Sequence, residues 1–138
     1  SIEMAVRGPD GPLAGTLLLA DMPGAPVVLI LPGSGPTDRD GNSGLGLSAG
    51  SYRLLAEALA ERGLSSARID KRGVGGSKDA SANPNKVTID DYAADTARWI
   101  AAISDNTDDD RSPSFALSAH TPPLVAAPQE RPMAGPAK

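Results

Sequence analysis

The chain lacks cysteine altogether and has a single histidine, His120, among its 138 residues. No disulfide can therefore form, and the absence of cysteine fits an exported protein as well as a cytoplasmic one. Because there is one histidine and no paired ligand spacing, the sequence predicts no protein-bound metal. The aspartates at 108–110 lack the glycine turn and the spaced ligands of a calcium loop, so we interpret them as a solvated charge run.

Basic clusters and long apolar runs are also missing. Lysine and arginine occur singly apart from Lys71-Arg72, and the net charge is −4, so neither nucleic acid nor a membrane surface is an expected partner. No apolar run approaches the roughly 20 residues that a membrane-spanning helix needs. The amino end does not have the pattern of a signal peptide. A chain that begins with Ser1 is compatible with removal of an upstream segment, so the compartment stays open.

The length of the chain predicts one domain with a hydrophobic core. We expect residues 1–103 to form its well-patterned part. Residues 104–138 have the composition of an acidic link followed by a poorly ordered tail rich in proline and alanine. Within that tail, only Phe115-Ala116-Leu117 has the pattern of a strand.

The first third of the chain predicts three strands. Residues 2–6 and 13–19 alternate apolar and polar side chains around a Gly-Pro-Asp-Gly turn, which predicts an antiparallel hairpin. The continuous apolar run Val27–Leu31 predicts a strand that is buried on both faces.

A helix is expected over residues 51–62, followed by a strand over residues 66–69. Gly63 would end this helix, and its buried face would carry Leu54, Leu55, Ala58 and Leu59. A strand, a helix and a strand in that order form a right-handed crossover, so the strands ending at Leu31 and Ile69 should be parallel.

A second helix should begin near Thr88, because Thr88 and Asp91 have capping-box spacing. Its apolar face recurs at three- and four-residue steps and contains Ile89, Tyr92, Thr96, Trp99, Ile100 and Ile103. Together these patterns predict an α/β fold that has a mostly parallel sheet and an antiparallel hairpin at its amino end.

The loop after Val27–Leu31 is the first candidate site. Successive backbone N–H groups of Gly33, Ser34 and Gly35 at the carboxyl end of a strand could surround one oxyanion or phosphate. The same glycines also suit an ordinary tight turn. Further along the loop, three charged residues either contact a substrate or, in the interpretation that we favour, hold the loop through a carboxylate–guanidinium pair: Asp38, Arg39 and Asp40.

A second motif, Asp70-Lys71-Arg72-Gly73-Val74-Gly75-Gly76-Ser77, follows the strand at residues 66–69. The hairpin, the buried strand, the G-S-G-P-T-D-R-D-G-N loop, the helix and this D-K-R-G-V-G-G-S string resemble the N-terminal portion of the α/β-hydrolase superfamily. The similarity is greatest to bacterial esterase-like and serine aminopeptidase-like members, and it covers about residues 13–103. It implies an incomplete α/β-hydrolase-like core.

The resemblance also implies an activity and a set of roles. Complete members are serine hydrolases that act on small carboxylic esters or related acyl substrates without a cofactor. Their loop after this strand supplies an oxyanion-hole N–H, which falls on Ser34, with Gly33 and Gly35 allowing close approach of the backbone. Asp70 and Arg72 would be structural and hold the next loop beside the site.

The chain departs from the family at the nucleophile. A complete member has a G-x-S-x-G elbow after the next strand, and an acid and a histidine further along. The segment at 115–122 stands in the expected place, but Ser118 and Pro122 occupy the glycine positions and His120 the nucleophile position. The resemblance therefore implies a truncated or degenerate member that is inactive alone and whose catalytic serine, acid and histidine are unknown.

Other interpretations stay open beside this one. Gly46-Leu47-Ser48-Ala49-Gly50 matches G-x-S-x-G and makes Ser48 a weak nucleophile candidate, although it lies well after the strand instead of at its tip. Gly44 and Gly46 with Asp70 imitate a dinucleotide fingerprint, so a dinucleotide-binding module is an alternative function. A non-catalytic interaction fold is another. We interpret His120 as a solvated residue of the tail.

The strand order of the family places Val27–Leu31 between the strand of Ile69 and the strand that bears the elbow. Only residues 115–117 can fill that last position, and so short a strand leaves much of an apolar edge unpaired. Unpaired edges recruit other chains through their free N–H and C=O groups. We therefore expect self-association through this edge.

Overall fold

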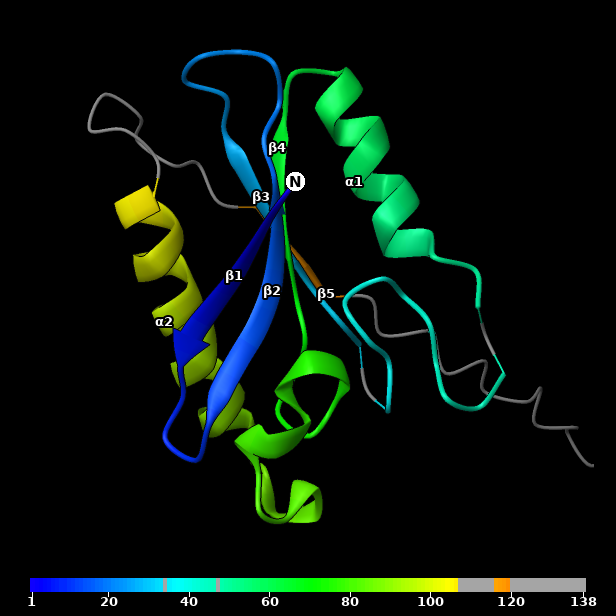
Figure 1. Ribbon diagram of the computed structural model, residues 1–138, viewed down its shortest axis with the longest axis vertical. Helices are drawn as coiled ribbons and strands as arrows, with labels where there is room; N and C mark the ends of the chain where they lie inside the picture. The colour runs from blue at the N-terminus through cyan, green and yellow to red at the C-terminus, as the bar shows by residue number, and fades with distance from the viewer. Residues whose placement is uncertain (34, 47, 107–115, 120–138) are drawn as a thin grey trace, which may run out of the picture.

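The computed structural model describes residues 1–33, 35–46, 48–106 and 116–119. In this part of the chain, a mixed sheet lies between two helices, which cover its opposite faces (Figure 1). The strands follow the spatial order β1-β2-β4-β3-β5. Their bounds are β1 (Ile2–Arg7), β2 (Pro12–Leu18), β3 (Val27–Leu31), β4 (Ser65–Ile69) and β5 (Ala116–Ala119).

The pairing of the strands confirms the hairpin and the crossover. β1 pairs with β2 antiparallel, and β3 pairs with β4 parallel. β3 also pairs with β5 in parallel, so it lies between β4 and β5 as expected. Phe115, which the sequence assigned to the last strand, lies outside the described residues.

The prediction of a mostly parallel sheet is not confirmed. β2 joins β4 in antiparallel orientation, so two of the four pairings between the described strands are antiparallel and two are parallel. The physical reason is that the hairpin does not form a separate unit. Its second strand, β2, also pairs with β4. The hairpin therefore belongs to the same sheet as the parallel strands and contributes two antiparallel pairings to it.

The core lies on the α2 side of the sheet. α2 (Ile89–Asn106) buries Trp99 and Ile103 against the strands. The apolar run of β3 is covered on both faces, because Val27, Leu29 and Ile30 are all buried. Side chains of a strand alternate between its two faces, so a strand that is covered by protein on both faces carries apolar side chains at successive positions.

The start of α2 forms the predicted capping box, with aspartate as the acidic partner. The Thr88 backbone N–H donates to Asp91 Oδ2 at 2.8 Å, and the Asp91 N–H donates to Thr88 Oγ1 at 3.2 Å. Ile89, which was assigned to the buried face, is exposed because it lies in the first turn, beyond the sheet contact. Two short 3₁₀ helices join β4 to α2: η1 (Gly75–Ala80) and η2 (Pro84–Lys86).

α1 (Ser51–Glu61) is followed by the predicted stop residue, Gly63, one position after the C-cap Arg62. Gly63 has a φ of +78° and donates its N–H to Ala60 O, while Leu64 donates to Leu59 O. This is the hydrogen-bond pattern of a Schellman motif. The predicted buried face was wrong in part, because Leu54 and Leu55 are 53% and 40% exposed. The buried residue of this helix is instead the small Ala56.

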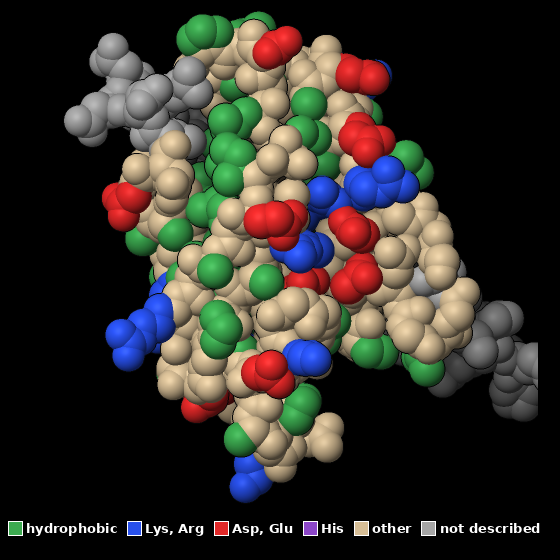
Figure 2. Space-filling view, in the orientation of Figure 1, with side chains coloured by type: hydrophobic (Ala, Val, Ile, Leu, Met, Phe, Trp, Pro, Cys, Tyr) green, Lys and Arg blue, Asp and Glu red, His purple; other side chains and the backbone are tan. Residues whose placement is uncertain are grey.

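The surface shows no concentration of one charge on the face seen in Figure 2, where acidic and basic side chains lie next to one another. None of the described helices is long and apolar enough to cross a bilayer.

Candidate active site

A cavity of about 720 Å³ lies at the carboxyl ends of β3 and β4. Its floor comes from the sheet and its wall from α2, through Tyr92, Thr96 and Trp99. Its rim is formed by the loop after β3 and by the residues that follow β4. Open α/β sheets bind ligands at this edge, because loops from neighbouring parallel strands meet there. The two loop motifs of the sequence therefore lie at one cavity.

The loop after β3 contributes Pro32, Gly33, Gly35 and Pro36 to the cavity. Gly35 has a φ of +84°, a conformation that glycine adopts without steric cost. Ser34, the residue on which the resemblance places the oxyanion N–H, lies outside the described residues. Of the three residues in the predicted oxyanion loop, the structure therefore describes the two glycines, Gly33 and Gly35.

Lys71 contacts this loop from the end of β4. Its Nζ donates hydrogen bonds to the carbonyl oxygens of Gly33 and Gly35, the second at 2.7 Å. Burial lowers the pKa of the Lys71 ammonium below its ordinary value, because the charged form loses part of its hydration. Sequence reasoning assigned no role to Lys71. Its position directly after Asp70, at the carboxyl end of a strand, was the available signal.

Asp70 joins two loops below the cavity. Its side chain is 1% exposed. Oδ1 accepts the backbone N–H of Arg39 at 2.7 Å, and Oδ2 accepts the N–H of Gly76 at 2.9 Å. Arg39 Nε also lies 3.4 Å from Oδ2. This carboxylate therefore connects the loop after β3 to η1, and its acceptor atoms are engaged within the protein.

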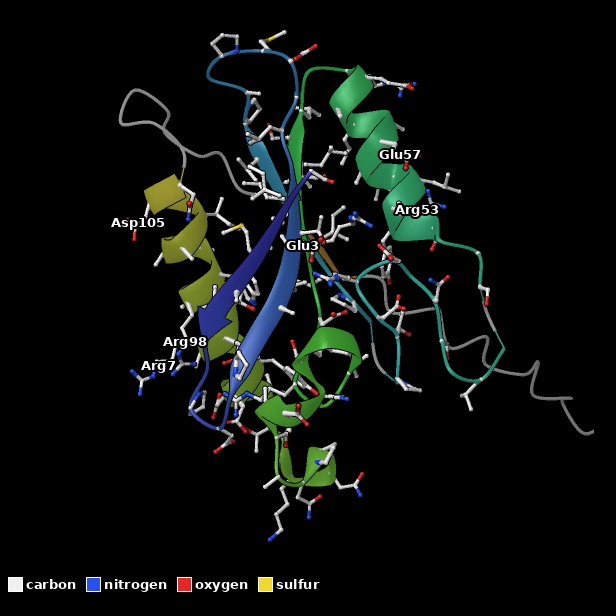
Figure 3. The ribbon with its side chains drawn as sticks, in the orientation of Figure 1. Glu3, Arg7, Arg53, Glu57, Arg98 and Asp105 are labelled. Atoms are coloured by element: carbon white, nitrogen blue, oxygen red, sulfur yellow. The ribbon has the colours of Figure 1, made fainter. Side chains whose placement is uncertain are left out.

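The other charges of the loop after β3 pair with residues outside the loop. Arg39 Nη1 lies 2.9 Å from Glu3 Oε2 on β1, and Asp40 pairs with the buried Arg68 of β4. In Figure 3, Glu3 lies over the middle of the sheet, whereas Arg53 and Glu57 point outward from α1. Carboxylate–guanidinium pairs thus fix the loop, and their partners come from β1 and β4.

Asp38 acts through the backbone of its own loop. Its Oδ1 accepts the N–H groups of Asp40 and Asn42, both at 2.9 Å. Its own N–H donates to Asn42 O, which closes the turn from the other side. Such carboxylate-to-backbone bonds are typical of Asx turns. The three charged residues considered for substrate contact therefore all have protein partners.

Arg72 is buried beside α2 and forms a two-pronged ion pair with Asp95. Nε donates to Oδ2 at 2.5 Å and Nη2 donates to Oδ1 at 2.9 Å. The hydrogen bonds that Arg72 donates to Asp95 raise the pKa of Arg72 above its ordinary value. Arg98 also donates to Asp95 Oδ1, at 2.9 Å. The pair anchors the residues after β4 to the helix that walls the cavity.

Sequence reasoning missed Asp95, although the helical spacing carried a signal. Position 95 lies three residues after Tyr92 and four before Trp99, which places it on the predicted apolar face. A carboxylate on such a face needs a buried cation, because a charge removed from water without a partner is costly. In the structure that cation is Arg72, the arginine of the second motif.

Ser48 and the glycines before it lie away from the strand tip. Ser48 is exposed in the loop that precedes α1, whereas β3 ends at Leu31. Gly46 donates its N–H to Ser43 O and belongs to a separate turn. The dinucleotide alternative is not favoured, because the Asp70 carboxylate that would hold the ribose is buried and already accepts two backbone N–H groups. His120 lies outside the described residues.

No group of three or more His, Cys, Asp or Glu residues in the described part of the chain could hold a metal ion. No protein-family model matches the chain, and no curated protein matches it in sequence.

Solved structures decide the fold. A putative α/β-hydrolase from Agrobacterium tumefaciens is 20% identical, with a TM-score of 0.59 over 84% of this chain and 48% of its own. The α/β-hydrolase GrgF from a Penicillium species is 18% identical, with a TM-score of 0.63 over 84% of this chain and 36% of its own. This chain has an α/β-hydrolase-like fold.

An α/β serine hydrolase without a lid, from Xanthomonas campestris, is 26% identical, with a TM-score of 0.55 over 86% of this chain and 50% of its own. The α/β-hydrolase-like chain thus spans about half or less of the length of these three structures. The likeness to these structures supports the α/β-hydrolase-like N-terminal portion that the sequence motifs resemble.

Proposed function

We propose that this chain supplies the oxyanion-stabilising half of a serine-hydrolase site that acts on carboxylic esters or related acyl substrates. The supporting observation is the loop after β3, which lies at the carboxyl edge of the sheet and lines the cavity with Gly33 and Gly35. The fold likeness to serine hydrolases gives this loop its expected role. In this proposal, the Ser34 N–H donates to the oxygen that becomes negative when the acyl carbon is attacked.

The remaining catalytic groups are not assigned to the described residues. An activated serine needs a base within hydrogen-bond reach and an acid that orients the base. Ser48 is exposed in a loop, and the segment at 115–122 carries Ser118 and Pro122 where an elbow needs glycine. We therefore infer that the chain does not turn over esters by itself.

The first test measures hydrolysis of p-nitrophenyl acetate by the chain and by a Ser34→Ala, Ser48→Ala double variant. The two rates should be equal, because the proposal assigns no activated nucleophile to this chain. A fluorophosphonate label identified by mass spectrometry gives the independent check. An adduct on any serine of the folded chain contradicts the inference, and an adduct on Ser48 would make that serine the nucleophile.

The second test gives the loop a nucleophile. A chimera joins this chain to the second half of the Xanthomonas serine hydrolase, which is 26% identical over the shared part. In an active chimera, Ser34→Pro removes the proposed N–H donor, whereas the control Ser34→Ala keeps it. Loss of one oxyanion donor lowers kcat by roughly 10²–10³. Equal kcat values for the two variants would exclude the Ser34 N–H as a donor.

A further inference from the structure

Lys71 binds the carbonyl side of the loop after β3. One ammonium nitrogen donates to two carbonyl oxygens that lie two residues apart, those of Gly33 and Gly35. All three residues line the same cavity. The neighbours of Lys71 in the motif do not share this task, because Asp70 binds Arg39 and Gly76.

An anion-binding loop must direct its N–H groups toward the anion and its carbonyl oxygens elsewhere. Carbonyl oxygens carry partial negative charge and would repel the developing oxyanion, whereas fixed N–H groups stabilise it without reorganisation. In a planar trans peptide, the C=O and the N–H of the same peptide unit point in opposite directions. A side chain that fixes the Gly33 carbonyl oxygen therefore also fixes the direction of the Ser34 N–H, which belongs to the same peptide unit. The Gly35 carbonyl precedes Pro36, which has no N–H, so the contact with it only anchors the loop.

We propose that Lys71 is a positioning residue of the oxyanion loop: through the Gly33 carbonyl oxygen it orients the Ser34 N–H toward the acyl oxygen of a substrate, and through the Gly35 carbonyl oxygen it anchors the other side of the loop. The inference rests on the proposed function, which identifies the anion. Lys71 does not touch the substrate in this arrangement, and it acts through the backbone.

The chemistry of lysine suits this role. Its ammonium group is a compact charge with three donors, so one nitrogen can serve two acceptors on adjoining turns of a loop. Hydrogen bonds from a charged donor are stronger than neutral ones, and partial burial strengthens them further. The same burial lowers the pKa of Lys71. Its titration therefore gives a signal by which the contact can be observed.

The test follows the backbone amide resonances of Gly33 and Gly35 in the full chain by ¹H–¹⁵N NMR. Lys71→Met removes the charge and the donors but keeps most of the aliphatic stem. Lys78→Met is the matched control, because Lys78 is exposed on η1 in the same segment. Lys71→Met should shift both glycine resonances, Lys71→Arg should shift them less because it keeps charged donors, and Lys78→Met should leave them in place.

A pH titration of the unchanged protein makes the test independent of whether Lys71→Met folds. The Gly33 and Gly35 resonances should move together with the Lys71 Cε signal, at a pH below the ordinary lysine value of 10.5. Glycine resonances that stay fixed while Lys71 titrates, or that are unchanged in a folded Lys71→Met protein, overturn the proposal. Failure of the proposed function is a different result, since it would appear as equal kcat values for Ser34→Pro and Ser34→Ala.

Discussion

The buried ion pair between Arg72 and Asp95 offers a quantitative test of how the cavity is held together. The Arg72 and Asp95 side chains are 6% and 8% exposed, and both prongs of the pair are within hydrogen-bond distance. Removing one partner of a buried pair costs about 3–5 kcal/mol, because the other charge is left in a poorly solvated site. Arg72→Met leaves Asp95 with Arg98 at 2.9 Å, so we expect a loss near the lower end, about 3 kcal/mol.

Asp95→Leu should cost at least as much. It leaves the Arg72 guanidinium with Asp91 and Asp10, at 3.6 and 3.9 Å. The double variant, Arg72→Met with Asp95→Leu, replaces the pair by apolar side chains and should lie within about 1 kcal/mol of the unchanged protein. A double-mutant cycle would then give a coupling free energy of several kcal/mol.

Urea unfolding followed by tryptophan fluorescence measures these differences. Trp99 is the single tryptophan of the chain and is buried beside the pair on α2. A loss of about 3 kcal/mol corresponds to a fall in Tm of about 10 °C for a domain of this size. Losses below about 1 kcal/mol for both single variants, or a double variant whose loss equals their sum, would refute the reasoning.

Four further outcomes are expected. Gly15→Ala should lower stability by about 1–3 kcal/mol in urea unfolding, because its Cβ would lie 2.7 Å from Cη2 of Trp99, while the control Gly44→Ala meets nothing within 4 Å and should be neutral. Gly35→Val should cost about 1–3 kcal/mol for the strain of positive φ, and an unchanged Tm would contradict the φ of +84°. The Thr16 hydroxyl on β2 donates to Glu3 and lowers the Glu3 pKa. The stabilisation from this contact is therefore present above pH 4.5 and disappears as the pH falls through the folded-state pKa of Glu3. Carboxyl NMR should show a Glu3 midpoint below 4.5. β5 forms one edge of the described sheet, so light scattering at micromolar concentration should show association, whereas a monodisperse monomer would show that this edge is covered.

Local patterns in the sequence were sufficient for much of the fold. The apolar run of β3, the capping box at Thr88 and the glycine stop at Gly63 each depend on residues within a few positions of one another. The family resemblance then supplied the order of the parallel strands, which no local pattern contains. The buried face of α1 was predicted less well, because a face of leucines suggests deep burial while the contact is made by Ala56.

The contacts of the candidate site were harder to predict because they join distant positions. The partners of Asp70 and Lys71 in the loop after β3 lie 31 to 38 residues away in the sequence. Periodicity identifies which residues are buried, but it does not identify which buried charge meets which. Arg68 illustrates the difficulty: it lies within the short strand β4 and is buried, yet nothing near it in the sequence indicates its pair with Asp40.

The three residues after β4 connect three different parts of the site. Asp70 binds the loop after β3 and η1, Lys71 binds the carbonyl oxygens of the same loop, and Arg72 binds α2 through Asp95. Loss of the Arg72 pair should therefore lower global stability and loosen the helical wall of the cavity. Loss of the Lys71 contacts should alter the loop while α2 stays in place. If both variants had the same effect on stability and on the Gly33 and Gly35 resonances, the motif would act as one rigid clamp, and a separate positioning role for Lys71 would have no physical basis.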